Sequence, residues 1–178
     1  MQAAEKRDAG VVWSTETFPM RKVAKSLLYR HEVINAAMLA MLDAVKKFEE
    51  KTFIPKSSAE INVSQKGKWN RSTEENDFRF SWNETTDCIL RKINASDSFP
   101  GALTTIFNDE LFCYGVVEET LFKEKPGEIS GKRDNAICIS TKDSALWIQC
   151  LRKNNKDAIK LPSVIALGDK EKIISELP

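Results

Sequence analysis

This sequence of 178 residues lacks the features that mark membrane, secreted and metal-binding proteins. It contains no apolar run approaching the ~20 residues that a membrane-spanning helix needs, and its N-terminus has no signal-peptide core. The 4 cysteines lie far apart with no Cys-x-x-Cys pair, and His31 is the only histidine, so we expect no metal site. Widely separated cysteines are typical of free thiols in a reducing compartment, and we therefore expect a cytoplasmic protein that contacts no membrane.

The sequence also lacks an excess of either charge and any complete catalytic motif. It has 27 Lys and Arg against 26 Asp and Glu, and a net charge of +1 does not favour RNA or an anionic membrane as partner. There is no glycine-rich phosphate loop, no Gly-x-Ser-x-Gly turn and no histidine beside a candidate nucleophile. What is present is 42% hydrophobic residues, which is enough for a soluble globular core.

The first 50 residues predict one strand and one long helix. Branched and aromatic residues favour a strand over residues 11–18, which Pro19 ends. From Ser26 to Glu50 the apolar residues recur every three or four positions, as in an amphipathic helix; they are Ile34, Met38, Met41, Val45 and Phe48. One strand and one helix cannot bury both their faces alone. We therefore expect them to pack on the rest of the chain, to pair with a second copy or to be loosely ordered.

Residues 51–78 are rich in turn and loop formers, which predicts a linker. The linker carries a small basic and aromatic group, and its members are the candidate substrate-binding residues Lys66, Lys68, Trp69 and Arg71. Two interpretations stay open for this group. It is either a solvated linker with Trp69 tucked onto the next domain, or a contact for phosphate or RNA, whose bases stack on aromatic rings.

The second half of the chain predicts a helix followed by short strands. Ser81 and Glu84 have the spacing of a capping box, and a helical apolar stripe follows, which Pro100 and Gly101 end. Strands are expected over residues 102–107, 111–117, 126–129, 136–140 and 145–151, with hairpin turns at 108–110 and 141–144 and a short helix over 170–177. Such strands favour a small β-barrel or sandwich. Its expected core residues are Ile89, Ile93, Leu103, Ile137, Ile139, Trp147 and Ile148.

Several motifs resemble the formyltransferases related to methionyl-tRNA formyltransferase. The run from Arg79 to Trp82 resembles the start of their C-terminal domain, and Pro100-Gly101 and Pro126-Gly127 resemble later pairs of that domain. Residues 1–12 resemble the motif that ends the catalytic domain, although Lys6 replaces an internal glycine. The resemblance implies that Asp8 is the aspartate of the family's catalytic Asn–His–Asp set. The Asn and His of that set have no counterpart in this sequence, and His31 does not match the family's histidine.

Further stretches match more closely the formyltransferase-like part of the hydrogenase maturation proteins that make the carbon monoxide ligand of nickel–iron hydrogenases. They cover nearly the whole chain and are residues 17–21, 25–33, 67–70, 89–97 and 160–163. This resemblance implies a protein that takes a formyl group from 10-formyltetrahydrofolate and passes it to coenzyme A. A second, crotonase-like domain, absent from this sequence, would then release carbon monoxide.

The resemblance also implies a fold of the α+β class. Residues 1–52 would be the remnant strand and long helix of a Rossmann-like formyltransferase domain, residues 53–71 a linker, and residues 72–178 a helix with a small OB-like β-barrel. Such a chain would be catalytically incomplete alone, would not hold the folate fully, and could form a homodimer through its exposed N-terminal segment. Two other functions stay open: a tRNA- or nucleic-acid-binding module, which the balanced charge disfavours, and a non-catalytic fragment that completes a formyltransferase from another chain.

Overall fold

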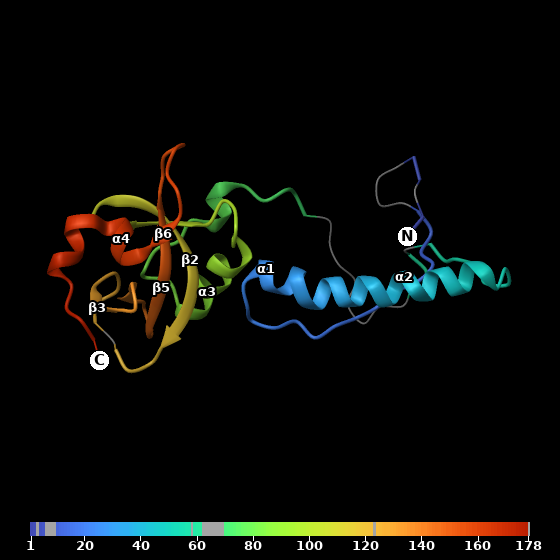
Figure 1. Cartoon of the computed structure of the whole chain (residues 1–178), viewed down its shortest axis with the longest axis horizontal. Coiled ribbons are helices and arrows are strands. Elements are labelled where there is room, and N and C mark those ends of the chain that lie inside the picture. The colour runs from blue at the N-terminus through green and yellow to red at the C-terminus, as the bar shows by residue number, and fades with distance from the viewer. Residues whose placement is uncertain (3, 6–9, 58, 62–69, 123, 178) are drawn as a thin grey trace. The chain divides into compact units, whose positions relative to one another are not determined.

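The structure is a computed structural model that describes residues 1–2, 4–5, 10–57, 59–61, 70–122 and 124–177. The chain divides into two compact units (Figure 1). Unit 1 comprises residues 1–21 and 27–72, and unit 2 comprises residues 22–26 and 73–178. Within the described ranges, no helix is both long enough and apolar enough to cross a lipid bilayer.

The long helix predicted from Ser26 to Glu50 is confirmed, although it has three parts. A short α1 (Lys25–Leu28) leads into a π-helical segment, η1 (Tyr29–Val33), which continues as α2 (Ile34–Glu49). π-Helical turns are rare single insertions within α-helices. No residue of α2 is buried. The predicted apolar stripe therefore exists, but it is exposed.

The strand predicted over residues 11–18 is wrong. In this segment the structure has a single isolated bridge, in which Val12 and Lys56 exchange backbone hydrogen bonds of 2.7 and 3.2 Å. The ring of Trp13 then lies against Phe48 and Phe53, with ring centroids 5.5 and 5.9 Å away. A strand needs a neighbour along its whole length. Here the neighbouring segment turns away immediately after Lys56, where Glu60 N–H donates to the Ser57 carbonyl.

Unit 2 is an antiparallel sheet with helices, as the α+β class predicts. Its strands are β1 (Ala102–Ile106), β2 (Asp109–Glu119), β3 (Ile129–Arg133), β4 (Ala136–Ser140), β5 (Ala145–Lys153) and β6 (Leu161–Pro162). They lie in the order β1-β2-β5-β4-β3, and β6 pairs with β5. The helix α3 (Thr86–Ala95) packs on β2 (Figure 1). A 3₁₀ turn, η2 (Glu75–Phe78), precedes it. The C-terminal elements α4 (Ser163–Leu167) and η3, a 3₁₀ helix (Gly168–Ile173), begin earlier than the helix predicted over 170–177.

The main core of unit 2 lies between α3, α4 and the sheet. Five of the seven predicted core residues belong to it: Ile89, Ile93, Ile137, Ile139 and Ile148. Leu103 and Trp147 are also buried, but each lies in a smaller cluster of its own, Leu103 with Phe112 and Trp147 with Cys138. Neighbouring residues of a strand point to opposite faces. Parts of the sheet are therefore covered on both faces.

Two tight turns, whose residues have positive φ, connect neighbouring strands. The β1–β2 turn consists of Phe107 and Asn108, with φ of 49° and 66°, so it ends before the predicted 108–110. Asp134 and Asn135 form the equivalent turn between β3 and β4, with φ of 50° and 65°. Two-residue turns of this kind match the twist of the strands that they join. The turn predicted at residues 141–144 is confirmed by a 2.8 Å hydrogen bond from Thr141 N–H to the Ser144 carbonyl.

Helix α3 begins four residues later than its capping box predicts, because its N-cap is Thr85 instead of Ser81. Ser81 N–H does donate to Glu84 Oε1 at 2.9 Å, but Ser81 and Glu84 close a turn ahead of the helix. The first helical N–H, of Thr86, is capped by Asp143 Oδ1 at 2.8 Å. Asp143 lies in the turn between β4 and β5, far along the chain, so no local pattern could indicate it.

Candidate functional site

Most of the site residues predicted from the sequence cannot be placed. Asp8, Lys66, Lys68 and Trp69 lie outside the described residues. The remaining one, Arg71, is exposed in unit 1, and its Nη1 donates to the Ser72 carbonyl at 2.9 Å. The predicted basic and aromatic group is thus represented in the structure by Arg71 alone. The geometry directs attention to two other places, both in unit 2.

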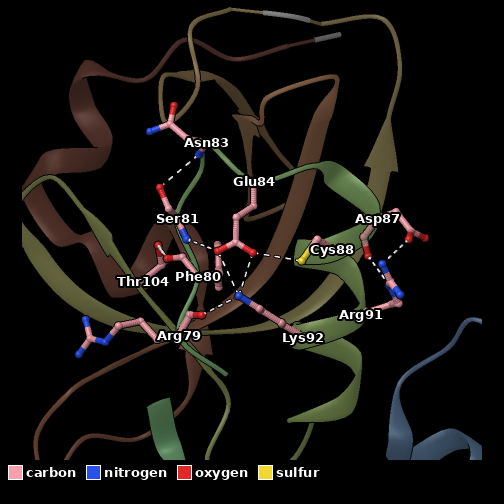
Figure 2. Close-up of polar contacts among 10 residues, drawn as sticks. All are labelled: Arg79, Phe80, Ser81, Asn83, Glu84, Asp87, Cys88, Arg91, Lys92 and Thr104. Carbon is pink, nitrogen blue, oxygen red and sulfur yellow. Dashed lines mark hydrogen bonds and ion pairs between the residues drawn. The ribbon is translucent and has the colours of Figure 1, made fainter. Parts of the chain in front are cut away.

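The first place is a polar network at the start of α3, which we name the Glu84 cluster: Ser81, Glu84, Cys88 and Lys92 (Figure 2). The Lys92 ammonium donates to both oxygens of Glu84, at 3.1 and 2.8 Å, and to the carbonyl of Arg79 at 2.9 Å. The Cys88 thiol donates to Glu84 Oε2 at 3.1 Å. The carboxylate is therefore surrounded by donors from the chain entering unit 2 and from the first turns of α3.

Electrostatics in the Glu84 cluster favour a charged carboxylate and a neutral thiol. Burial raises the pKa of Glu84, but the bonds from Lys92, Ser81 N–H and Cys88 outweigh it, so its pKa lies below the ordinary value. The same hydrogen bond to Glu84, followed by burial, raises the pKa of Cys88 above the ordinary thiol value. The thiolate is the nucleophilic form of cysteine. The neutral thiol is therefore favoured at Cys88, and the cluster links the chain entering unit 2 to α3.

A second polar group fixes α3 to the sheet. The hydroxyl of Thr86 bonds to Asp143 Oδ1 at 2.7 Å and to the Thr141 hydroxyl at 2.6 Å, and Thr86 and Thr141 are both buried. The Thr86 N–H and then the Thr86 hydroxyl lower the pKa of Asp143. Asp143 thus acts as a tertiary N-cap, which satisfies one of the free N–H groups of the helix start.

The second place is a hollow on the outer side of β4 and β5, which we name the Trp147 hollow. It measures 410 Å³, and its walls include Val117, Arg133, Asn135, Trp147, Gln149 and Pro162. The Arg133 guanidinium lies 4.7 Å from the centroid of the Trp147 ring, and the indole N–H donates to Glu119 Oε2 at 3.0 Å. A guanidinium held over an indole is an arrangement that can stack on a planar group and pair with an anion. The hollow is suited to binding, and its lining also includes the carboxylate of Asp134.

Sequence reasoning missed both places. Trp147 was predicted as core, and it is buried, but its ring faces the hollow side of the sheet under Arg133. The strand register that brings Arg133 near Trp147 becomes visible only when β4 is paired with both neighbours. Glu84, Cys88 and Lys92 do recur at intervals of four, which is a helical spacing that could have indicated a shared face.

Among the described residues, no group of three or more His, Cys, Asp or Glu side chains is arranged to hold a metal ion. All 4 cysteines are free, which agrees with the prediction of separate thiols. Of the family's Asn–His–Asp set, which the resemblance links to the folate-dependent reaction, only Asp8 belongs to this sequence, and it lies outside the described residues.

Comparison with known proteins gives a consistent result. The family described as "Formyl transferase, C-terminal domain" matches residues 73–166. The chain is 30% identical over 165 residues to the hydrogenase maturation factor HoxX of Bradyrhizobium diazoefficiens, a match that covers 92% of this chain and 29% of HoxX. The chain thus spans less than a third of the length of this curated relative.

Solved structures of HypX from Aquifex aeolicus are similar over nearly the whole chain. The complex of HypX with tetrahydrofolic acid matches with a TM-score of 0.88 and 38% identity, over 99% of this chain and 30% of HypX. A multiply substituted HypX variant matches with a TM-score of 0.89 and 38% identity, over 99% of this chain and 31% of that protein. Both units of the chain are therefore included in the similarity.

Proposed function

Because this chain belongs to the formyl transferase C-terminal domain family, we propose that it is the central segment of a formyltransferase-like hydrogenase maturation protein. The observation that carries the proposal is the similarity to HypX over 99% of the chain at 38% identity. An accessory module alone would match only over unit 2. Here the likeness extends through unit 1, which in the proposed protein would join a preceding domain.

In the reaction that we propose for the whole protein, 10-formyltetrahydrofolate donates the formyl group and coenzyme A accepts it. HypX has been solved with tetrahydrofolic acid, which supports a folate donor. Within this chain, Asp8 would orient a histidine supplied by the preceding domain. Formyl transfer needs a proton acceptor for the attacking thiol and a polariser for the formyl oxygen. Asp8 alone supplies neither, so the chain by itself should show only background transfer.

We propose the finer architecture on the same basis. Residues 1–52 would complete a Rossmann-like formyltransferase domain, residues 53–71 would be the linker, and residues 72–178 would form an OB-like barrel. All 4 cysteines are free, which supports the proposal that the protein acts in the reducing cytoplasm. An accessory role for unit 2 is supported by the Glu84 cluster, in which the hydrogen bond to Glu84 and burial favour the neutral form of the Cys88 thiol.

The task of unit 2 would be to hold the acceptor at the Trp147 hollow. Coenzyme A has a planar adenine and charged phosphates. The exposed Arg133 guanidinium, held over the buried Trp147 ring, offers a planar cation, and the exposed Gln149 and Asn135 add amide groups at the rim. A volume of 410 Å³ lies within the range of ordinary small-molecule sites, about 300–1,000 Å³, and suffices for one end of such a ligand.

Calorimetric titration of coenzyme A into the full chain tests whether the Trp147 hollow binds the formyl acceptor. We expect Arg133→Ala to weaken binding at least about tenfold, since it removes a charged contact worth about 1.5–3 kcal/mol. Arg152→Ala is the matched control, because the Arg152 guanidinium lies in the same way over Phe112, at 4.2 Å, outside the hollow. Absence of binding, or equal weakening by both substitutions, would refute the acceptor site.

A further inference from the structure

We propose that Arg152 and Lys160 form a binding site for a phosphate group on the face of β2 that is turned away from the main core. The Arg152 guanidinium lies 4.2 Å from the centroid of the Phe112 ring, and the Lys160 ammonium lies 5.2 Å from that of the Tyr114 ring. Both rings are buried in a cluster separate from the main core. We name these two cations and two rings the Arg152 site. It shares no residue with the lining of the Trp147 hollow, so this inference goes beyond the proposed function and does not rest on it.

Arg152 is held by neutral acceptors along one edge of its guanidinium. Its Nε donates to the Tyr114 hydroxyl at 3.0 Å, and its Nη2 donates to the Pro100 carbonyl at 3.0 Å. These bonds use two of the five N–H groups of the side chain. Within the described part of the chain, the other three N–H groups, on the edge between Nη1 and Nη2, have no acceptor. Such an edge matches two oxygens of one anion.

The charges of the Arg152 site are not balanced by acids. Among the described residues, neither Arg152 nor Lys160 forms an ion pair with Asp or Glu. Glu110 shares this face of β2, but its carboxylate is already bonded to Arg79 at 2.8 Å and to Asn154 at 3.0 Å. The two cations therefore face the same side of the sheet with no anion of the chain between them.

The support of Arg152 is built into the Pro100-Gly101 pair. The Tyr114 hydroxyl donates to the Pro100 carbonyl at 2.5 Å, and it accepts from Arg152. A Cβ at Gly101 would lie 2.5 Å from the Tyr114 ring, so a glycine is needed for this approach. Tyr114 is 3% exposed and Arg152 is half-buried. The guanidinium is thus fixed before a ligand arrives, and donors that are fixed in advance lose little freedom on binding.

A phosphate group suits the site better than a carboxylate. Both cations contact Tyr114, Arg152 at its hydroxyl and Lys160 near its ring, so one anion there interacts with both charges. A phosphate ester carries nearly two negative charges and three acceptor oxygens at neutral pH, whereas a carboxylate would leave one cation unbalanced. The loop of residues 153–160 adds to the positive charge, with three lysines against one aspartate. Because the cations lie over both rings, the site offers no open ring for a base, and it recognises the phosphate group itself.

Titration of the full ¹⁵N-labelled chain with inorganic phosphate, followed by amide NMR shifts, tests the site. We expect saturable shifts centred on residues 112–114, 150–153 and 160, with a dissociation constant of about 1 mM or more. Glycerol phosphate is titrated in parallel to identify the source of the group. Tighter binding of the ester indicates a phosphorylated small molecule, and equal or tighter binding of free phosphate indicates the inorganic ion. A site this weak stays nearly empty when coenzyme A is titrated at micromolar concentrations.

Three variants separate the built site from general attraction. Arg152→Lys keeps the charge but loses the planar edge, so it should weaken phosphate binding about three- to tenfold. Lys160→Ala should weaken it by a similar factor, whereas Lys156→Ala, an equal loss of charge in the same loop, should leave it unchanged. The same spectra show whether each variant is folded.

Four results would overturn the phosphate site. They are an absence of saturable shifts up to about 50 mM phosphate, shifts centred on the Trp147 hollow, acetate that binds as tightly as phosphate, and equal weakening by Lys160→Ala and Lys156→Ala. A folded Arg152→Lys variant that binds phosphate as well as the wild type would show that the guanidinium edge is not used, and it too would overturn the proposal.

Discussion

At the scale of single residues, one hydrogen bond in unit 2 moves the pKa of two groups in opposite directions. The Cys88 thiol donates to Glu84 at 3.1 Å. This bond stabilises the charged carboxylate and the neutral thiol, so it lowers the pKa of Glu84 and raises that of Cys88. Lys92 bonds to the same carboxylate and keeps it ionised. The ionisable side chains of Glu84, Cys88 and Lys92 therefore bond to one another as part of the structure of unit 2.

The raised pKa of Cys88 predicts how its reactivity depends on Glu84. Replacement of Glu84 by Gln removes the charge, so the pKa of Cys88 should fall toward the ordinary value of about 8.5. Alkylation of Cys88 by iodoacetamide near pH 8 should then become about three- to tenfold faster. Site-resolved mass spectrometry measures this rate. Cys113, which is buried, serves as control. If Cys113 reacts faster as well, the variant has opened the fold, and an unchanged rate at Cys88 contradicts the assignment.

Asp143 predicts a pH dependence of stability. The Thr86 N–H and hydroxyl lower its folded-state pKa, so its contribution is present above the ordinary carboxyl pKa of about 3.9 and is lost as the pH falls through the folded value. Asp143→Asn should therefore lower the denaturant midpoint of unit 2 at pH 7. The difference from the wild type should shrink below about pH 4. A difference that is equal at pH 7 and pH 3 would show that the cap is not ionic.

At the scale of elements, the sequence predicts what local pattern controls and misses what distant partners control. The strand β4 and the start of β5 coincide with the predicted bounds, because alternating apolar residues are flanked by turn formers. The start of α3 was misplaced because Asp143, not Ser81, caps it. The strand predicted over residues 11–18 does not form, because the segment that bridges to Val12 turns away after Lys56. The Trp147 hollow depends on the pairing of β3, β4 and β5, and so it could not be read from any single stretch.

At Gly115 the strand β2 adopts a positive-φ conformation that disfavours a side chain. The φ of Gly115 is +63°, and an added Cβ would lie 2.5 Å from Gln149 Oε1 on the paired strand β5. Gly115→Ala should destabilise unit 2 by about 1–2 kcal/mol, since side chains disfavour this conformation. Chemical denaturation measures the loss. The double variant with Gln149→Ala separates the two causes: it should recover the steric part only, and complete recovery would show that the backbone conformation costs nothing.

At the scale of the whole molecule, the two units differ in how far they bury their apolar residues. Unit 2 has a core of fully buried residues such as Ile89, Leu146 and Ile148, whereas no residue of α2 in unit 1 is buried. The apolar face of α2 in unit 1 stays exposed in this chain, which spans about 30% of the length of HypX.

The charge and the surface of unit 2 predict weak or no RNA binding. The net charge of the whole chain is +1, and in unit 2 the residues Phe112 and Tyr114 are 2% and 3% exposed, with Arg152 and Lys160 over their rings. Bases need open rings on which to stack, and each phosphate contact loses strength as salt rises. Filter binding of transfer RNA should therefore show no submicromolar affinity at ~150 mM salt. Tight binding there would favour the nucleic-acid module instead.

The most direct test of the central claim is formyl transfer by a chimera. The segment of Aquifex aeolicus HypX that corresponds to this chain is replaced by residues 1–178, and transfer from 10-formyltetrahydrofolate to coenzyme A is measured beside the parent and the isolated chain. We predict that the chimera keeps at least about a tenth of the parent rate, that Asp8→Asn lowers it at least about a hundredfold, and that the isolated chain stays at background. A folded chimera that binds tetrahydrofolate but transfers no formyl group, or one indifferent to Asp8→Asn, would contradict the claim.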